Sequence, residues 1–184
     1  MKARVLFAFG MITLALSVLA GTVKTNAVAA AAPTPVPRTM PNFAPMKMFM
    51  GTWHCTQQLR GKVRTDTSTT TMALDGQYMM THDVSPPFDK YRSVNDVIDS
   101  YVTYNPVTKL WTTIGVDNYG GYFVNTSPGW SGNTMRTTIK MSNDGSSGYD
   151  VLTKLSDTST TDHSVTKGPN GKVTTATINC RKTA

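Results

Sequence analysis

The side chains that could do acid–base or metal chemistry are few in this chain of 184 residues. It has 11 aspartates, no glutamate and three histidines, His54, His82 and His163. No two histidines have the close spacing that places two metal ligands on one face of a strand or helix. The aspartates have no spacing that marks an acid–base pair, and no Gly-x-Ser-x-Gly motif is present to carry a serine nucleophile. We therefore assign no catalytic residue and no metal ligand from the sequence.

Aromatic and methionine side chains are more suggestive, because they line adaptable apolar cavities. Tyr119 and Tyr122 flank a Gly-Gly pair, and glycine tolerates backbone angles that other residues avoid. We expect this turn to form a mobile aromatic rim. Trp111 and Tyr104 complete the ligand-binding set that we predict. The same side chains can also fill a core, and the sequence leaves both readings open.

The N-terminus has the pattern of a secretory signal peptide. Lys2 and Arg4 precede an uncharged, largely apolar run over residues 5–20, as in the first two regions of such a signal. The run is shorter than the about 20 apolar residues of a transmembrane helix, and an uncleaved anchor is the alternative. We place the signal peptide at residues 1–27 and expect a secreted or periplasmic protein without a transmembrane span after cleavage.

Residues 28–46 hold five of the ten prolines and many alanines. Because proline removes a backbone donor and blocks helix and sheet, we expect a disordered tether here. The folded domain then spans residues 47–184, which is enough chain for one core. The net charge of +7 is spread along the chain without a basic run. We therefore expect no nucleic-acid partner.

Composition and turn signals predict an all-β fold. The chain has 30 threonines and no glutamate; threonine suits strands, whereas glutamate is a good helix former. Ten β-prone runs alternate with Gly, Pro, Asn and Asp turns: residues 52–60, 63–72, 77–84, 97–104, 110–117, 122–126, 134–141, 149–155, 158–166 and 172–180. This spacing predicts a single antiparallel up-and-down barrel of about 8–10 strands, with a β-sandwich as the alternative.

Alternation along the runs indicates which side chains share a face. Trp53, Cys55 and Leu59 fall on one face of the first run. Ile114 and Val116 belong to a second apolar face, in the run 110–117.

The two cysteines, Cys55 and Cys180, fall in the first and last predicted strands. An even number of cysteines in an exported chain favours a disulfide, and in a closed meander the first and last strands are neighbours. A sandwich could also bring them together. Two reduced thiols are the alternative, and neither cysteine has a second ligand at metal-site spacing. We predict a disulfide between them.

The start of the first strand, Gly51-Thr52-Trp53, resembles the Gly-x-Trp motif of the calycin superfamily, the lipocalins and their relatives. Two later segments, residues 74–76 (LDG) and 101–111 (YVTYNPVTKLW), resemble uncharacterised bacterial exported proteins in which a strand ending in Tyr-x-Pro turns back into a strand with Trp. The resemblance implies a lipocalin-like barrel. In it, Gly51 lets the chain bend and Trp53 packs across the closed end.

Two kinds of function remain. The first is a non-catalytic module that binds a small apolar or amphipathic ligand or an envelope partner, without a cofactor. The second is an enzyme that acts on a small lipid at the barrel mouth. Haem or metal binding is a further alternative, because a related barrel family binds haem through a histidine near its C-terminal strand; His163 is the candidate, although its flanking residues differ. The missing catalytic constellation favours the binding module.

Overall fold

The structure, a computed structural model, describes residues 40–59, 62–87 and 93–183, so the predicted signal peptide and most of the predicted tether lie outside it. The described residues form one short 3-10 helix and eleven strands. They are η1 (Ala44–Phe49), β1 (Gly51–Leu59), β2 (Lys62–Ala73), β3 (Tyr78–Ser85), β4 (Asp96–Asn105), β5 (Leu110–Asp117), β6 (Tyr122–Ser127), β7 (Trp130–Ser131), β8 (Thr134–Ser142), β9 (Ser147–Ser156), β10 (Ser159–Lys167) and β11 (Val173–Lys182).

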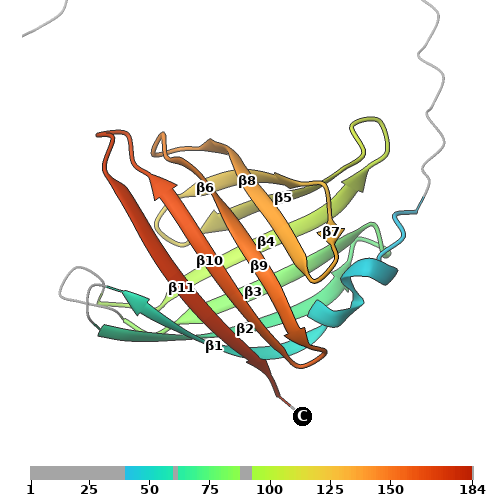
Figure 1. Cartoon of the computed structure of the whole chain (residues 1–184), viewed down its shortest axis with the longest axis horizontal. Coiled ribbons are helices and arrows are strands. Elements are labelled where there is room, and N and C mark those ends of the chain that lie inside the picture. The colour runs from blue at the N-terminus through green and yellow to red at the C-terminus, as the bar shows by residue number, and fades with distance from the viewer. Residues whose placement is uncertain (1–39, 60–61, 88–92, 184) are drawn as a thin grey trace, which may run out of the picture. The chain divides into compact units, whose positions relative to one another are not determined.

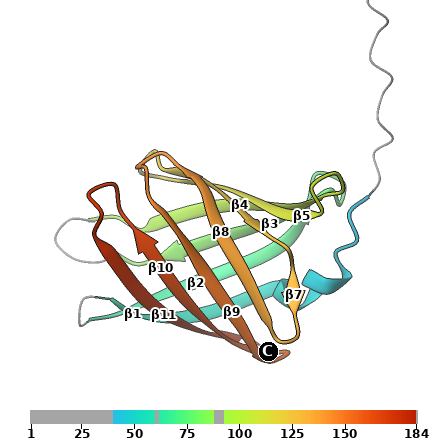
Figure 2. The same ribbon diagram turned by 45° about the horizontal axis from the view of Figure 1, so that its top comes forward.

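The strands form one closed antiparallel barrel (Figures 1 and 2). Each long strand pairs with its neighbours in the sequence, β1 pairs with β11, and β6 pairs with β8. The two-residue strand β7 pairs with β8 alone among the described strands and lies outside the ring. The predicted up-and-down barrel is therefore confirmed with ten strands in the ring, and the sandwich alternative is wrong.

The ten predicted runs match the ten strands of the ring to within a few residues at each end. This agreement follows from the local nature of the signals, since β-branched runs and turn residues act over a few positions. The strand β7 was not predicted, because two residues are too short for a periodic pattern.

Cross-strand register fixes which face of each strand lies inside the barrel. Trp53 and Cys55 are buried, as the alternation predicts. In β5 the inward face carries Trp111, Thr113 and Gly115, whereas Ile114 and Val116 are about half exposed on the outer face. The apolar face of residues 110–117 therefore lies outside the barrel.

The ring of Phe123 explains why residue 115, on the inward face of β5, is a glycine. A Cβ atom on Gly115 would overlap the ring of Phe123 on the paired strand β6. The Phe123 ring of β6 occupies the space that a side chain at residue 115 of β5 would need. The barrel interior is therefore close-packed at this position without a side chain from β5.

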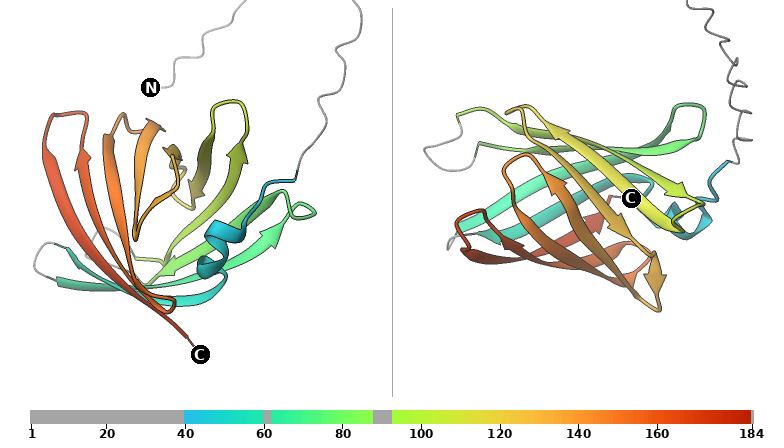
Figure 3. Two further views of the ribbon diagram at one scale, coloured as in Figure 1. Left: turned by 45° about the vertical axis from the view of Figure 1, so that its right-hand side comes forward. Right: turned by 90° about the horizontal axis from the view of Figure 1, so that it is seen from above.

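The helix η1 lies against the end of the barrel where β1 begins and β11 ends (Figure 3). Phe43 and Met46 pack into the core here, and Met46 is only 2% exposed. The packed chain therefore starts several residues before the boundary that we expected at residues 46 and 47. A proline at the helix start fits this position, because its fixed φ suits a first turn.

Among the described residues, no helix has the length and apolar character needed to cross a membrane.

Candidate ligand-binding cavity

A cavity of about 230 Å³ lies inside the barrel at the end that η1 covers. The side chains that line it come from η1 and most strands of the ring, and the larger ones are apolar. They are Met46, Phe49, Trp53, Cys55, Ser68, Thr70, Met79, Thr81, Val102, Trp111, Thr113, Ser127, Met135, Thr137, Leu152, Thr160 and Cys180.

The number of strands explains why a cavity is present. A barrel of eight strands has an interior just wide enough for its side chains or one small ligand, and the diameter grows with the number of strands. The ring here has ten strands, and many of its inward residues are as small as Ser68, Thr113 and Ser127. Small side chains in a wider ring leave space that the core does not fill.

Two tryptophan side chains fasten η1, which we call the cap, to the end of the barrel. The indole N–H of Trp53 donates to the carbonyl oxygen of Phe49 at 3.1 Å, and that of Trp130 donates to the carbonyl oxygen of Pro45 at 2.8 Å. The rings of Phe49 and Trp130 stack with centroids 5.9 Å apart. Trp53 is 5% exposed and lies at the end of the barrel that η1 covers.

Gly51 lies at the junction between η1 and β1. Its φ is +96°, a left-handed angle that glycine adopts without the penalty of a Cβ atom. The chain turns here from η1 into β1, which brings Trp53 beneath the helix.

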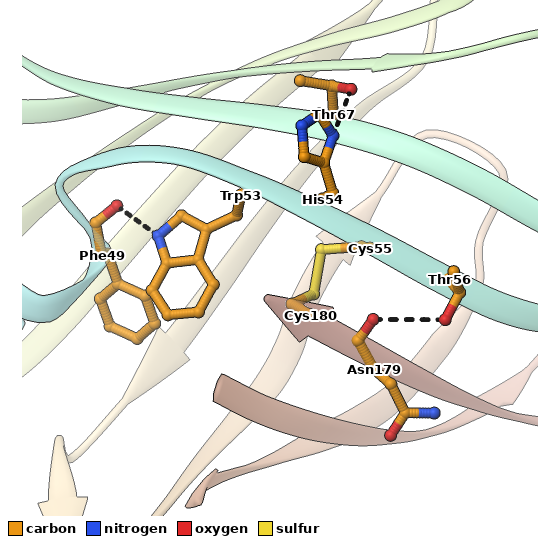
Figure 4. The surroundings of a disulfide bond; sticks show 8 residues. All are labelled: Phe49, Trp53, His54, Cys55, Thr56, Thr67, Asn179 and Cys180. Carbon is orange, nitrogen blue, oxygen red and sulfur yellow. Dashed lines mark hydrogen bonds between the residues drawn. A yellow bond between two sulfur atoms is a disulfide. The ribbon is translucent and has the colours of Figure 1, made fainter. Parts of the chain in front are cut away.

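The predicted disulfide between Cys55 and Cys180 is present, and it forms part of the cavity wall. The two residues are cross-strand partners in the β1–β11 pair. Figure 4 shows the disulfide and Trp53 on one side of β1 and the His54 ring, which contacts Thr67, on the other.

The hydroxyl groups in the wall are partly satisfied by one another. Thr70 Oγ1 and Thr81 Oγ1 are 2.9 Å apart across β2 and β3, and Ser127 Oγ accepts the backbone N–H of Gly129 at 3.0 Å. A wall of aromatic rings, thioethers and a few hydroxyls suits a ligand that is mainly apolar with an occasional polar atom.

Four aspartates follow the cavity lining one inward position further from η1. Asp66 and Asp83, on β2 and β3, are two residues from Ser68 and Thr81 of the lining. On β9 and β10, Asp150 and Asp162 are likewise two residues from Leu152 and Thr160. We call these four residues, Asp66, Asp83, Asp150 and Asp162, the acidic layer.

Burial raises the pKa of each carboxyl group in the acidic layer, because the ionised form loses hydration. The effect is largest for Asp162, whose pKa rises to about 6 through burial first and the nearby charge of Asp150 second. A carboxyl group with such a pKa takes up and releases protons near neutral pH.

One ion pair neutralises a further interior carboxylate. Arg64 on β2 donates from Nη2 to Oδ2 of Asp96 on β4 at 2.8 Å, and Asp96 is 6% exposed. The Arg64 guanidinium is therefore the ion-pair partner of Asp96. Its positive charge also lowers the pKa of Asp66, but burial raises that pKa by more.

Two of the four predicted ligand-binding residues lie at the capped end. Trp111 is 7% exposed and lines the cavity. Tyr104 is the cross-strand partner of Trp111 and packs beside it with ring centroids 5.3 Å apart, but it is not part of the cavity lining.

The other two lie at the opposite end of β5 and β6 and are not part of the cavity lining. Tyr119 donates from its hydroxyl to the carbonyl oxygen of Val94 at 3.3 Å. Tyr122 is 46% exposed and pairs with Val116 on the outer face. The structure therefore separates Tyr119 and Tyr122 from Trp111 and Tyr104.

The Gly-Gly turn between these tyrosines is held by hydrogen bonds. Asp117 Oδ1 accepts the backbone N–H groups of Tyr119 and Gly121 at 2.8 and 2.7 Å. Asn143, from the β8–β9 turn, accepts the N–H of Tyr122 at 3.1 Å and donates to the carbonyl oxygen of Gly120 at 3.3 Å. This geometry fastens the turn to its neighbour rather than leaving it as a free rim.

The three histidines lie on the outer face of the barrel. His54 contacts Thr67, His82 pairs with Asp99 at 2.6 Å, and His163 is 3.5 Å from Thr177. Within the described residues, no group of three His, Cys, Asp or Glu side chains is placed to hold a metal ion.

Sequence reasoning missed most of the cavity lining and the whole acidic layer. Alternation along 158–166 was a usable signal only for a shared face, since it puts Thr160 and Asp162 on the same side of the strand. It could not say that this face is inside, or that Asp150 lies on the next strand beside it.

A scan against protein-family models finds no match to this chain, and neither does a search of curated proteins.

Proposed function

We propose that this chain is a non-catalytic binding module whose barrel holds a small apolar or amphipathic molecule. The observation that carries the proposal is the cavity of about 230 Å³ beneath η1, with Trp53, Met79 and Trp111 in its wall. Removing apolar ligand surface from water contributes about 25 cal/mol per Å². A preformed apolar cavity supplies that gain without first ordering the protein.

The proposal includes a place among the calycins and an exported location. The left-handed φ of Gly51 and the hydrogen bond from Trp53 to Phe49 at the start of β1 support the calycin part of the proposal. The disulfide between Cys55 and Cys180 suits an oxidising compartment such as the periplasm or the cell exterior. The signal-peptide pattern in residues 1–27 gives the route.

Fluorescence titration of the purified chain with N-phenyl-1-naphthylamine, an uncharged apolar probe, tests the proposal. Thr113→Phe places a ring in the cavity, whereas Thr112→Phe places the same ring on the outer face of the same strand. We expect saturable binding by the wild type, at least tenfold weaker binding by Thr113→Phe, and unchanged binding by Thr112→Phe. Circular dichroism and thermal melting check that both variants fold.

Wild-type protein that shows no saturable binding would reject the proposal. Equal binding by wild type and a folded Thr113→Phe variant would also reject it, because the probe would then lie elsewhere. The same titration tests the predicted rim with a Tyr119→Ala/Tyr122→Ala variant. Since neither tyrosine belongs to the cavity lining, we expect its affinity to equal that of the wild type.

A second candidate function, an enzyme acting on a small lipid, is favoured by one observation. A general acid works best when its pKa lies near the working pH, and the pKa of Asp162 rises to about 6 beside Asp150. Hydrolysis of p-nitrophenyl octanoate tests this candidate. Turnover that Asp162→Asn abolishes and Asp157→Asn retains would support it, and no turnover above buffer would reject it.

An envelope partner would use the outer surface. The side chains of Ile114, Val116, Tyr122 and Met141 are each about half exposed on neighbouring strands of the outer face. This apolar surface supports a protein partner as the alternative to a ligand in the cavity.

A further inference from the structure

The acidic layer is not explained by a ligand that is only apolar. Asp66, Asp83, Asp150 and Asp162 direct four carboxyl groups to the barrel interior, directly beyond the cavity lining. Burying a carboxylate costs free energy unless an opposite charge or hydrogen bonds compensate it. A chain that only needed a lipid-like pocket would be more stable with Ser or Thr at these positions, as in the rest of the wall.

Among the described residues, nearby basic side chains offset the effect of burial on this layer only in part, since the pKa of all four carboxyl groups stays raised although Arg64 acts on Asp66, His82 on Asp83 and His163 on Asp162. Arg64 is in an ion pair with Asp96 at 2.8 Å. At the capped end, Lys154 pairs with the exposed Asp157 at 2.6 Å, and Lys182 donates to the carbonyl oxygen of Met48 at 3.3 Å. These contacts direct the lysines to the outer rim of the cap, away from the acidic layer.

One oxygen of the layer is buried and lacks a donor. Oδ1 of Asp162 is shielded from solvent and has no hydrogen-bond partner among the described residues. On β6, three strands along the ring from β10, Oδ1 of Asn125 is likewise buried and without a hydrogen-bond partner among the described residues. Buried acceptors without a hydrogen-bond donor are rare in folded proteins, so each of them needs a physical reason. Both are acceptors, so a ligand that donates hydrogen bonds would satisfy them.

We propose that the molecule bound in the cavity is a cationic amphiphile, whose ammonium group lies between Asp150 and Asp162 while its apolar part contacts Trp53, Trp111 and Met79. This inference rests on the proposed function, since the apolar part occupies the cavity already described. An ammonium group has three N–H donors and no acceptor. It therefore supplies the charge and the hydrogen bonds that this wall lacks.

The spacing of wall and carboxylates suits such a molecule. The acidic side chains are one inward position from the lining, which is about 6.6 Å along a strand. A short apolar chain in the cavity thus ends beside Asp150 and Asp162 rather than in bulk water. Coulomb attraction is stronger in this partly desolvated position than at the surface.

An organic cation fits better than a metal ion. Within the described residues, no three acidic, histidine or cysteine side chains converge as metal ligands would. Asp66 and Asp83 on one side, and Asp150 and Asp162 on the other, are separated by β1 and β11. A divalent ion needs several oxygens within about 2.6 Å, whereas an ammonium group is held by one or two carboxylates and the field of the others.

Three eight-carbon probes that differ only in the head group test the inference: octylamine, 1-octanol and octanoate. Each displaces N-phenyl-1-naphthylamine from the wild type, Asp150→Asn, Asp162→Asn and Asp157→Asn at neutral pH and low salt. Asp157→Asn is the control, because it removes the same formal charge from an exposed site. Thermal melting checks the fold of each variant.

We expect the wild type to bind octylamine at least tenfold more tightly than 1-octanol, and octanoate most weakly. Asp150→Asn and Asp162→Asn should each reduce octylamine affinity about tenfold and leave that of 1-octanol unchanged, and Asp157→Asn should change neither. Equal affinities for octylamine and 1-octanol would overturn the inference and leave the proposed function standing. Equal effects of all three substitutions would also overturn it, since the attraction would then come from net charge. If no probe binds, both the inference and the proposed function fail.

Discussion

Cys55 in β1 and Cys180 in β11 are direct cross-strand partners whose Cα atoms lie 4.0 Å apart, and their disulfide joins the first and last long strands of the barrel. The bridge spans 125 residues of sequence. It therefore fastens the seam at which a meander of consecutive hairpins closes on itself, and it does so in the wall of the cavity.

Removing this disulfide should destabilise the barrel strongly. A loop of this length restricts the unfolded chain by roughly 4 to 5 kcal/mol in the chain-entropy model. Urea unfolding of a Cys55→Ser/Cys180→Ser variant against the oxidised wild type measures the loss. Intact-mass analysis with and without reductant is the control, and free thiols in protein from an oxidising compartment would contradict the bridge.

Trp53 should contribute through both its ring and its N–H group. Because the side chain is 5% exposed, Trp53→Ala should cost about 3–5 kcal/mol, the usual range for deleting a buried aromatic ring. Trp53→Phe keeps a ring and loses mainly the hydrogen bond to Phe49, which is worth about 1 kcal/mol. Chemical denaturation compares the two variants, and equal losses would mean that the hydrogen bond, not the ring, holds the cap.

Gly115→Ala should destabilise the barrel by about 1–3 kcal/mol through overpacking, because the added methyl group meets the Phe123 ring. Phe123→Leu should remove the clash, so the double variant should be more stable than the sum of the single effects predicts. A double-mutant cycle measures this coupling. Additive losses would show that the ring moves aside without cost.

Stability should fall as pH rises from about 4 to about 7. The pKa of Asp162 is about 6 in the folded chain and about 3.9 in an unfolded one. Between these values the folded state binds more protons, so protonation favours folding and ionisation removes that advantage. Burial raises the pKa of Asp66, Asp83 and Asp150 as well, and these shifts act in the same direction.

Urea unfolding across this pH range measures the effect, and Asp162→Asn should flatten the dependence by stabilising the barrel most above pH 6. The matched control is Asp157→Asn, because hydrogen bonding to Lys154 lowers the pKa of Asp157. Its effect should have the opposite sign, with a small loss of stability at neutral pH. A wild-type stability that rises between pH 4 and 7 would contradict the prediction.

The strands and their order follow from local signals in the sequence. Threonine-rich runs and Gly, Pro, Asn or Asp turns act over a few residues, so ten strands were predicted close to their observed bounds. Their short connections made consecutive strands neighbours. The pairing of Cys55 with Cys180 followed, since the two ends of a closed meander must meet.

The tertiary structure alone decided which face of each strand is inside. Along 110–117, alternation identified an apolar face with Ile114 and Val116 but did not say on which side of the barrel wall it lies. Closure turned Trp111 and Thr113 inward, because Gly115 on that face leaves room for Phe123. The sequence did not predict that η1 packs on the barrel, because the prolines of this segment indicate disorder locally. The buried side chain of Met46 and the indole hydrogen bonds of Trp53 and Trp130 fasten it in the folded chain.

The acidic layer likewise depends on the tertiary structure rather than on local sequence signals. Asp66, Asp83, Asp150 and Asp162 are widely spaced in the sequence, and no local pattern singles them out. Only the register of the closed barrel places all four one inward position beyond the cavity lining. The physical reason is that alternation specifies a face within one strand, whereas the depth of a side chain in the barrel depends on the stagger of every strand between them.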